Sequence, residues 1–200
     1  IPVTVFSDYI CPFCYVGSHR LLALADEFDL DIVWANIEIH PDNPPEGKPV
    51  TELGYPPAQW RRMMAALERM ATAEGLPIAE RDFTTNSRRA LLLAEAAKEA
   101  GRETFACLHR RLFEGYFGER RNIGDAEVLR ELAAECGMDA ARVEAAWTEP
   151  RFAERLRDYH EAAARVGVTG TPTYIIDNER ALVGAVETDD LRRALAMASG

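Results

Sequence analysis

Apolar residues at the start of the chain follow a strand–helix–strand pattern. The run Val3–Tyr9 is rich in β-branched and aromatic residues, which predicts a buried strand. Apolar residues then recur at helical spacing from Leu21 to Phe28, and Asp31–Ile39 again has the composition of a strand. Two strands joined by a helix form a parallel βαβ unit, whose crossover is almost always right-handed.

The middle of the chain changes in character. His40–Pro49 is dense in proline and predicts an irregular loop, because proline lacks a backbone donor and blocks helix formation. From about Pro56 to Val166 the chain is rich in Ala, Leu, Glu and Arg, with glycine and proline breaks. This pattern predicts about five or six helices that pack into a bundle of their own.

Strand patterns return only near the end. Thr171–Asp177 and Ala181–Val186 flank the polar stretch Asn178–Arg180, which predicts a hairpin. Thr188, followed by two aspartates, predicts the N-cap of a last amphipathic helix. We therefore expect an α/β protein. Its main domain comprises residues 1–50 and 167–200, and residues 56–166 form a helical insertion domain.

Composition and charge exclude several classes of protein. The 200 residues are 48% hydrophobic and 28% charged, as in ordinary globular proteins. A net charge of −10 argues against nucleic acid or an anionic membrane as a partner. No apolar run is long enough to cross a bilayer, and no signal peptide is visible. We expect a cytoplasmic protein, although a start at Ile1 leaves room for a removed segment.

Two of the four cysteines, Cys11 and Cys14, follow the first predicted strand at C-x-x-C spacing. At a helix start, the first sulfur lies near unsatisfied N–H groups and the positive end of the helix dipole, which lowers its pKa. The second cysteine lies almost one turn further on and can resolve a mixed disulfide. Pro12 suits the first helical turn, and Phe13 adds no charge. The motif therefore favours a redox dithiol.

A structural zinc site and a chance pairing are the alternatives for this motif. Zinc needs about four ligands, but His19 and His40 stand alone and no second C-x-x-C occurs. We therefore expect no metal. His19 is also too far from Cys11 to share its proton, because the two lie roughly 12 Å apart along a regular helix.

A second feature is Gly167–Ile176, in which Pro172 stands at the start of a predicted strand. Proline cannot donate to a sheet ladder, but a cis peptide in a tight bend makes this position tolerable. A trans proline that ends a loop is the alternative. The combination with the upstream cysteine pair favours the cis form.

These motifs resemble the DsbA family of thioredoxin-fold thiol-disulfide oxidoreductases, and more narrowly its FrnE-like branch. The residues that carry the resemblance lie at the start, after the second predicted strand and near the end: Cys11-Pro12-Phe13-Cys14-Tyr15-Val16-Gly17, Glu38, Pro41-Asp42, Pro45-Glu46-Gly47 and Gly167-Val168-Thr169-Gly170-Thr171-Pro172-Thr173.

The resemblance implies a thioredoxin-like fold interrupted by a helical insertion, and a disulfide oxidoreductase that exchanges disulfides with protein or small-molecule thiols. Cys11 would be the nucleophile and Cys14 the resolving thiol. Thr171–Pro172 would be a cis peptide that faces the disulfide and pairs with an extended substrate. Pro12 and Phe13 would also contact the substrate. No cofactor is implied, except glutathione as a co-substrate.

The alternative function is that of a glutathione-dependent isomerase or transferase, of the 2-hydroxychromene-2-carboxylate isomerase or kappa-class type. These relatives typically have serine at the first cysteine position and lack the second cysteine, so Cys11 and Cys14 argue against them. Asn86 opens a helix that could overhang the active site, but we interpret it as a helix cap.

Other residues are interpreted as structural. Cys107 and Cys136 are expected to be buried small side chains, with a second disulfide as the alternative. His109 and His160 lie in charged helical stretches and are expected to be solvated. A stripe at helical spacing is interpreted as core rather than as a binding groove: Trp60, Met63, Met64, Leu67 and Met70.

Overall fold

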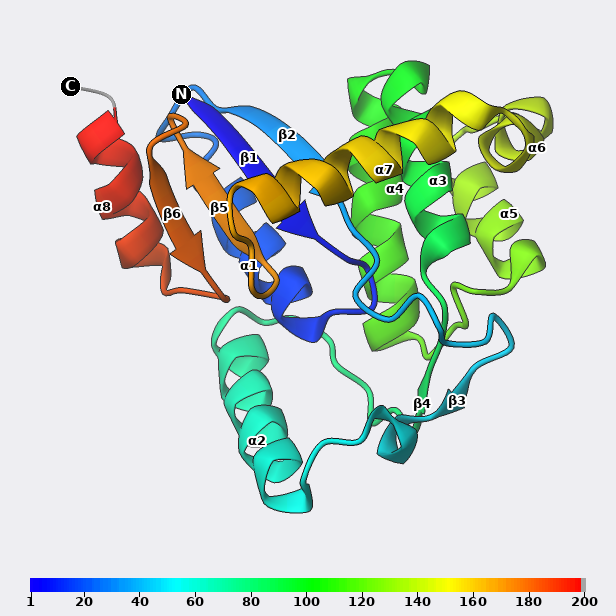
Figure 1. Cartoon of the computed structure of the whole chain (residues 1–200), viewed down its shortest axis with the longest axis horizontal. Coiled ribbons are helices and arrows are strands. Elements are labelled where there is room, and N and C mark those ends of the chain that lie inside the picture. Colours follow the sequence, from blue (N-terminus) through cyan, green and yellow to red (C-terminus); the bar gives the residue numbers. More distant parts are fainter. Residues whose placement is uncertain (199–200) are drawn as a thin grey trace.

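The computed structural model describes residues 1–198 and contains a four-stranded sheet at one end of the molecule (Figure 1). Strand β1 (Pro2–Ser7) pairs in parallel with β2 (Asp31–Asn36) and antiparallel with β5 (Thr173–Ile176). Strand β6 (Arg180–Val183) completes the order β2-β1-β5-β6. The expected β-α-β and β-β-α units therefore share one sheet.

Helices α1 (Pro12–Leu22) and α8 (Thr188–Ala198) pack on one face of this sheet. Side chains alternate along a strand, so Val3 and Val5 point to this face. The shared core contains these valines together with Leu21, Leu24, Trp34, Tyr174, Leu191 and Leu195. The structure thus confirms a helix after the first strand and another after the hairpin.

Helix α7 (Pro150–Arg165) runs along the other face of the sheet (Figure 1). Its residue Ala163 shares a small core with Phe6, Ala35 and Ile37. The prediction that the helices between residues 56 and 166 pack only among themselves is therefore wrong for α7. The physical reason is that β1 and β2 expose apolar side chains on both faces, and each face needs a cover.

The remaining helices of this region form one body that is built onto the cysteine segment. Their core cluster includes Leu91, Leu112 and Phe113, and it is continuous with Tyr9 and Tyr15 on either side of the cysteines. The exact domain boundaries expected from the sequence stay a prediction. The elements of this body are α3 (Arg88–Ala100), α4 (Arg102–Phe113), the π-helical turn η2 (Glu114–Gly118), α5 (Ala126–Glu135) and α6 (Ala140–Thr148).

One part of the region stands apart from that body (Figure 1). Helix α2 (Pro57–Ala73) lies beyond the N-terminal end of α1, and its Leu67 packs against Val16 of α1. Its neighbours in the chain are the 3₁₀ turn η1 (Val50–Leu53) and the short strands β3 (Lys48–Pro49) and β4 (Phe83–Thr84). The loop expected over 40–49 is thus irregular up to its last two residues.

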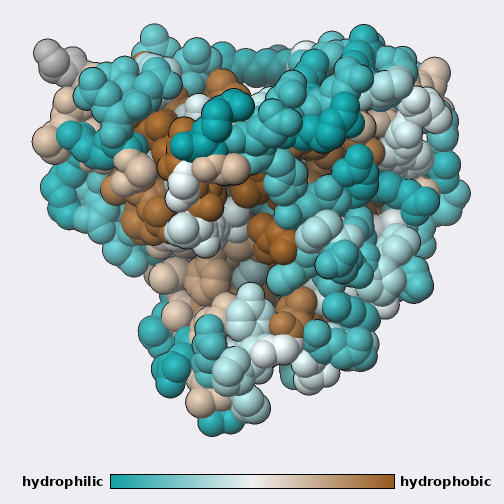
Figure 2. Space-filling model, in the orientation of Figure 1, coloured by the Kyte–Doolittle hydropathy of each residue, from teal (hydrophilic) through white to brown (hydrophobic). Residues whose placement is uncertain are grey.

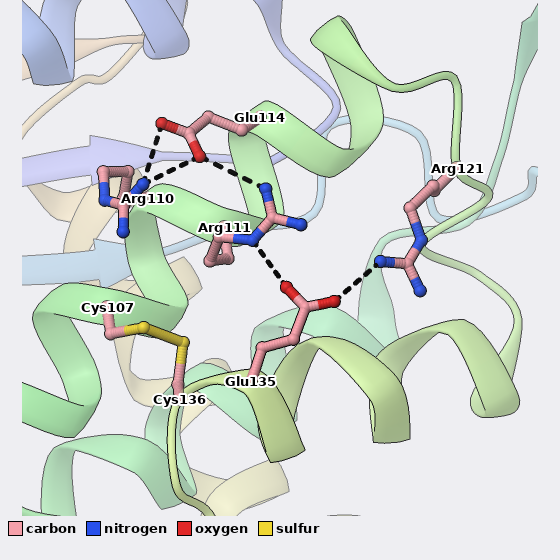
Figure 3. Close-up of a disulfide and its surroundings, with 7 residues drawn as sticks. All are labelled: Cys107, Arg110, Arg111, Glu114, Arg121, Glu135 and Cys136. Atoms are coloured by element: carbon pink, nitrogen blue, oxygen red, sulfur yellow. Dashed lines mark hydrogen bonds and ion pairs between the residues drawn. A yellow bond between two sulfur atoms is a disulfide. The ribbon is translucent and has the colours of Figure 1, made fainter.

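A disulfide joins Cys107 in α4 to Cys136 at the end of α5. The expectation that both are free buried thiols is wrong, and the disulfide alternative describes the structure. Figure 3 shows Glu135 beside the bridge, where its carboxylate accepts hydrogen bonds from Arg111 at 2.7 Å and Arg121 at 3.2 Å. The bridge and the ion pairs hold α4 and α5 together.

Within residues 1–198, no helix combines the length and the apolar character that a membrane span requires. The same residues contain no cluster of three or more His, Cys, Asp or Glu side chains that could hold a metal ion.

Candidate active site

Cys11 and Cys14 lie at the start of α1, where the sequence places them. Cys11 is the N-cap residue, with extended backbone angles, and Pro12 is the first helical residue. Both sulfurs are free thiols, and the side chains are 5% and 1% exposed. The Cys14 backbone N–H donates to the Cys11 carbonyl oxygen at 3.1 Å, which closes the first turn. The structure therefore holds a reduced dithiol.

The two thiols differ in acidity. A hydrogen bond from the Cys14 thiol holds the pKa of Cys11 below its usual value, and burial opposes this effect. Burial raises the pKa of Cys14, and the neighbouring Cys11 sulfur raises it further. The backbone N–H of Cys14, in the first turn of α1, lowers the pKa of Cys11 further. Cys11 is thus the more acidic thiol.

The Thr171–Pro172 peptide is cis and lies beside Cys11. The Cys11 thiol donates a hydrogen bond to the Thr171 carbonyl oxygen, with a sulfur–oxygen distance of 3.5 Å. Gly17 allows α1 to approach this peptide closely. A Cβ atom at position 17 would lie 2.9 Å from the Pro172 Cγ and 2.1 Å from the Tyr174 hydroxyl oxygen. The glycine therefore sets the distance between α1 and the start of β5.

Asp8 is a site residue that the sequence argument missed. Its side chain is 1% exposed, and burial raises its pKa to about 7. The carboxylate accepts hydrogen bonds from Ile10 N at 3.2 Å, Ile39 N at 2.9 Å and Ser87 Oγ at 3.0 Å. These hydrogen bonds connect the segment just before Cys11 to the segment after β2 and to the start of α3. An acidic residue at the end of an apolar strand, three positions before Cys11, is the sequence signal for it.

His109 is buried, so the expectation of a solvated side chain is wrong. Its Nδ1 lies 2.9 Å from the Tyr9 hydroxyl and its Nε2 lies 2.7 Å from the Ser18 hydroxyl. Burial lowers its pKa to about 3, so the ring is neutral. The apolar neighbours Phe105 and Phe113, one turn away on each side, are the signal for a buried face. His160, by contrast, is exposed as expected.

A cleft with a volume of about 460 Å³ opens beside Cys11, and we call it the cysteine cleft. Three further predicted site residues, Pro12, Phe13 and Thr171, also line it, whereas Cys14 and Pro172 are buried next to it. Figure 2 shows apolar side chains gathered between the main body and the projection formed by α2 and the β3–β4 pair.

Helix α2 forms one wall of the cysteine cleft. Trp60, Met63 and Met64 line the cleft, and only Leu67 of the same stripe is fully buried. The interpretation of this stripe as core is therefore wrong for its first half. The physical reason is that α2 projects beyond the main body and packs on α1 only near its middle, so its N-terminal turns face the cleft.

The interpretation of Asn86 as a helix cap is wrong, because the N-cap of α3 is the next residue, Ser87. The Asn86 Oδ1 accepts a hydrogen bond from the Arg88 N–H at 2.9 Å, and its Nδ2 donates to the Pro41 carbonyl at 2.9 Å. It therefore joins the loop that follows β2 to the start of α3. Glu38, in the same region, forms an ion pair with Arg88 at 2.8 Å.

Several known proteins are similar to this chain over nearly its whole length. The protein YwbO of Bacillus subtilis, described as uncharacterized, is 27% identical over 98% of this chain and 96% of its own. The solved structure of the probable DsbA oxidoreductase SCO1869 from Streptomyces coelicolor is 30% identical. It covers 100% of this chain and 90% of its own length, with a TM-score of 0.88.

The structure of a 2-hydroxychromene-2-carboxylate isomerase is similar in fold, with a TM-score of 0.80 at 20% identity, over 100% of this chain and 96% of its own. The model of the family described as the DSBA-like thioredoxin domain matches residues 2–196. Together with the sheet order, the helical insertion and the cysteine pair at the start of α1, this match shows that the chain belongs to the DSBA-like thioredoxin domain family.

Proposed function

We propose that this protein is a thiol-disulfide oxidoreductase in which Cys11 and Cys14 exchange disulfides with thiol-containing substrates. The main observation in favour of this proposal is the pair of free thiols at the start of α1. Of the two, Cys11 has a lowered pKa and lines the cysteine cleft. DsbA-like proteins act on thiols and disulfides, and the relative SCO1869 is described as a probable DsbA oxidoreductase.

The chemistry follows from the difference in acidity. The Cys11 thiolate attacks one sulfur of a substrate disulfide, the substrate S–S bond breaks, and the departing thiolate takes up a proton. The resulting mixed disulfide is attacked by Cys14 after it loses its proton. This step releases the second substrate thiol and leaves a Cys11–Cys14 disulfide, so two electrons pass to the substrate. Two molecules of an external thiol such as glutathione, acting as co-substrate, return the protein to the dithiol: the first forms a mixed disulfide, and the second attacks it and leaves as the oxidised disulfide. The reverse sequence oxidises substrate thiols.

The substrate would lie along Thr171. The Thr171 carbonyl oxygen already accepts a hydrogen bond from the Cys11 thiol, and the preceding residues Thr169 and Gly170 line the same cleft. An extended substrate could pair with this backbone as an added strand, which brings its sulfur to Cys11. Pro12 and Phe13 would contact the substrate from the other side. Membership of the FrnE-like branch and a cytoplasmic location are part of the same proposal.

The test is a redox titration in glutathione buffers with trapping of free thiols. It uses the chain in which Cys107 and Cys136 are replaced by alanine, so that only one dithiol titrates. We expect a reversible two-electron couple that Cys11→Ser abolishes. Cys14→Ser should instead accumulate a mixed disulfide with glutathione at Cys11.

Two outcomes would count against the proposal. A thiol titration that is unchanged by Cys11→Ser would exclude Cys11 as the nucleophile. Turnover of a glutathione-dependent isomerisation that persists in Cys14→Ser would favour the alternative function, which the fold likeness to the isomerase by itself does not establish.

A further inference from the structure

The charged groups of the cysteine cleft differ in sign from the rest of the protein. The chain carries 33 acidic residues and a net charge of −10. Yet among residues 1–198, Arg81 and His40 are the only ionisable groups besides Cys11 and Tyr55 in the lining, and no carboxylate belongs to it. Burial and the nearby Lys48 lower the pKa of His40. The fixed charge of the cleft is therefore the Arg81 guanidinium.

Arg81 is held by aromatic rings. The carbon of its guanidinium lies 4.1 Å from the centre of the Tyr116 ring, 4.9 Å from that of Phe117 and 5.9 Å from that of Phe83. Such cation–π contacts position a planar guanidinium without neutralising it. The side chain is therefore fixed in orientation and keeps its charge available.

The hydrogen-bond donors of Arg81 are incompletely used. Within the described part of the chain, its Nε and Nη1 are buried and have no hydrogen-bond partner. Arg20, which is fully buried, has such partners: it donates to Glu74 at 2.7 Å and pairs with Glu187 at 3.0 Å. A guanidinium that is shielded from water and has neither a counter-ion nor acceptors for its donors is unfavourable, and a carboxylate supplies both the charge and the acceptor oxygens.

We propose that Arg81 binds a carboxylate of the disulfide substrate, so that the cysteine cleft selects disulfides that carry a carboxylate near the exchanging sulfur. This inference rests on the proposed function and adds the chemical class of the substrate. The carboxylate would enter beside the apolar wall of α2, which accepts the uncharged part of the substrate, while the sulfur lies at Cys11. A small carboxylate-bearing disulfide and an acidic segment of a protein share this chemistry.

The test compares three small symmetric disulfides that differ in charge. Bis(2-hydroxyethyl) disulfide is neutral, 3,3′-dithiodipropionate is anionic and cystamine is cationic. The second-order rate constant for oxidation of the reduced protein is measured with each, for the wild type, Arg81→Met, Arg81→Lys and the control Arg69→Met. Arg69 is exposed on α2 and outside the cleft lining, so its loss changes the net charge equally.

We expect the wild type to prefer the anionic disulfide over the neutral one. Arg81→Met should lower the rate constant for dithiodipropionate by about 10-fold to 100-fold, as the loss of a charge-assisted hydrogen bond predicts. Its rate with the neutral disulfide should change by less than about 2-fold, and Arg69→Met should keep the preference. Arg81→Lys keeps the charge but loses the paired donors, so an intermediate preference is expected.

Three outcomes would overturn the inference. An equal loss with all three disulfides in both Arg81→Met and Arg81→Lys, with a lowered unfolding temperature, would show a structural role. A wild type that reacts with all three but has no charge preference would overturn the inference and leave the proposed function intact. A wild type that reacts with none would overturn both.

The source of the carboxylate is distinguished by a second pair of probes. Two peptides in mixed disulfide with a neutral thiol, one with Glu and one with Gln next to its cysteine, are compared in the same assay. An Arg81-dependent preference for the Glu peptide indicates protein substrates. A preference confined to dithiodipropionate indicates small molecules.

Discussion

The acidity of Cys11 depends on the residue three positions further on. The first cause of its lowered pKa is the hydrogen bond from the Cys14 thiol, and the hydrogen bonds from Thr171 and from the Cys14 backbone N–H contribute less. Burial acts in the opposite direction. The nucleophile and the resolving thiol are therefore coupled before any substrate binds.

Replacement of Cys14 tests this coupling. Cys14→Ala removes the donor, so we expect the pKa of Cys11 to rise. Cys14→Ser keeps a hydroxyl donor at the same position and should raise it less. The pH dependence of thiolate absorbance in the ultraviolet measures both values. Equal pKa values in the wild type and Cys14→Ala would show that the helix start, and not Cys14, controls the acidity.

His109 makes stability depend on pH. The folded protein keeps the ring neutral down to about pH 3, whereas the unfolded chain takes up a proton near the ordinary pKa of 6.5. Between these values the unfolded state binds more protons. The stability that His109 contributes is thus present above about pH 6.5 and is lost as the pH falls towards 3.

The variant His109→Gln tests whether His109 causes this loss of stability between pH 6.5 and pH 3. The variant cannot titrate, so we expect its unfolding free energy to fall less steeply than that of the wild type between pH 6.5 and pH 3. At pH 7 it should be less stable by about 2 to 4 kcal/mol, because ring contacts are lost. Asp8, with its raised pKa, makes the free energy of unfolding change with pH in the opposite direction. Asp8 is present in both proteins, so its effect cancels when the curve of the variant is subtracted from that of the wild type. Parallel curves from denaturant titrations would refute the assignment.

At the scale of elements, the position of α1 on β5 depends on one small residue. Gly17 faces Tyr174, whose hydroxyl has no hydrogen-bond partner among residues 1–198. Any side chain at position 17 must therefore displace either the tyrosine or the helix that carries both cysteines.

A double-mutant cycle tests this contact. Gly17→Ala should reduce stability by about 1 to 3 kcal/mol, because the added methyl overlaps the Tyr174 hydroxyl and crowds Pro172. Tyr174→Phe removes the unpartnered hydroxyl and should have little effect alone. In combination it should recover part of the loss, since the two residues are in contact. Additive losses in thermal or urea unfolding would show that the helix moves without involving Tyr174.

Helices α2 and α4 show where periodicity misleads. A helical stripe indicates which residues share a face but not what that face meets. In α2 the stripe from Trp60 to Met64 faces a cleft, because the helix projects from the body. In α4 the charged neighbours Arg110 and Arg111 obscure the stripe of Phe105, His109 and Phe113, which packs against the residues around the cysteines.

For the whole molecule, the helical region stabilises the cysteine segment by sharing its core. The disulfide between Cys107 and Cys136 closes a loop with a sequence separation of 29 in that region. It lies outside the cysteine cleft lining. Its expected contribution is therefore to the stability of the fold and not to disulfide exchange.

Replacement of both Cys107 and Cys136 by alanine separates the two roles. We expect the unfolding free energy to fall by about 3 to 4 kcal/mol, from the larger conformational freedom of the unfolded chain. The rate of exchange at Cys11 with a neutral disulfide should stay within about 2-fold, since neither Cys107 nor Cys136 lines the cysteine cleft. Denaturant unfolding and stopped-flow kinetics measure the two quantities. A large loss of exchange rate in a folded variant would mean that the second disulfide acts on the site.

The sequence by itself determined the order of the elements, the dithiol at a helix start and the proline at the start of a strand. These features depend on neighbours within a few positions, and local preferences of the backbone and of apolar residues express them directly. The burial of Asp8 and His109 and the exposure of the α2 stripe depend on how distant segments pack, so local patterns do not predict them.

Only the tertiary structure decided how the site is assembled. Cys11 meets Thr171 across a sequence separation of 160, and Arg81 joins the same cleft from the short β3–β4 region. Such contacts arise because the sheet places β1 next to β5, and because the helical region must cover the apolar residues around the cysteines. The fold class follows from local patterns, whereas the chemistry of the cleft follows from which segments the closed core brings together.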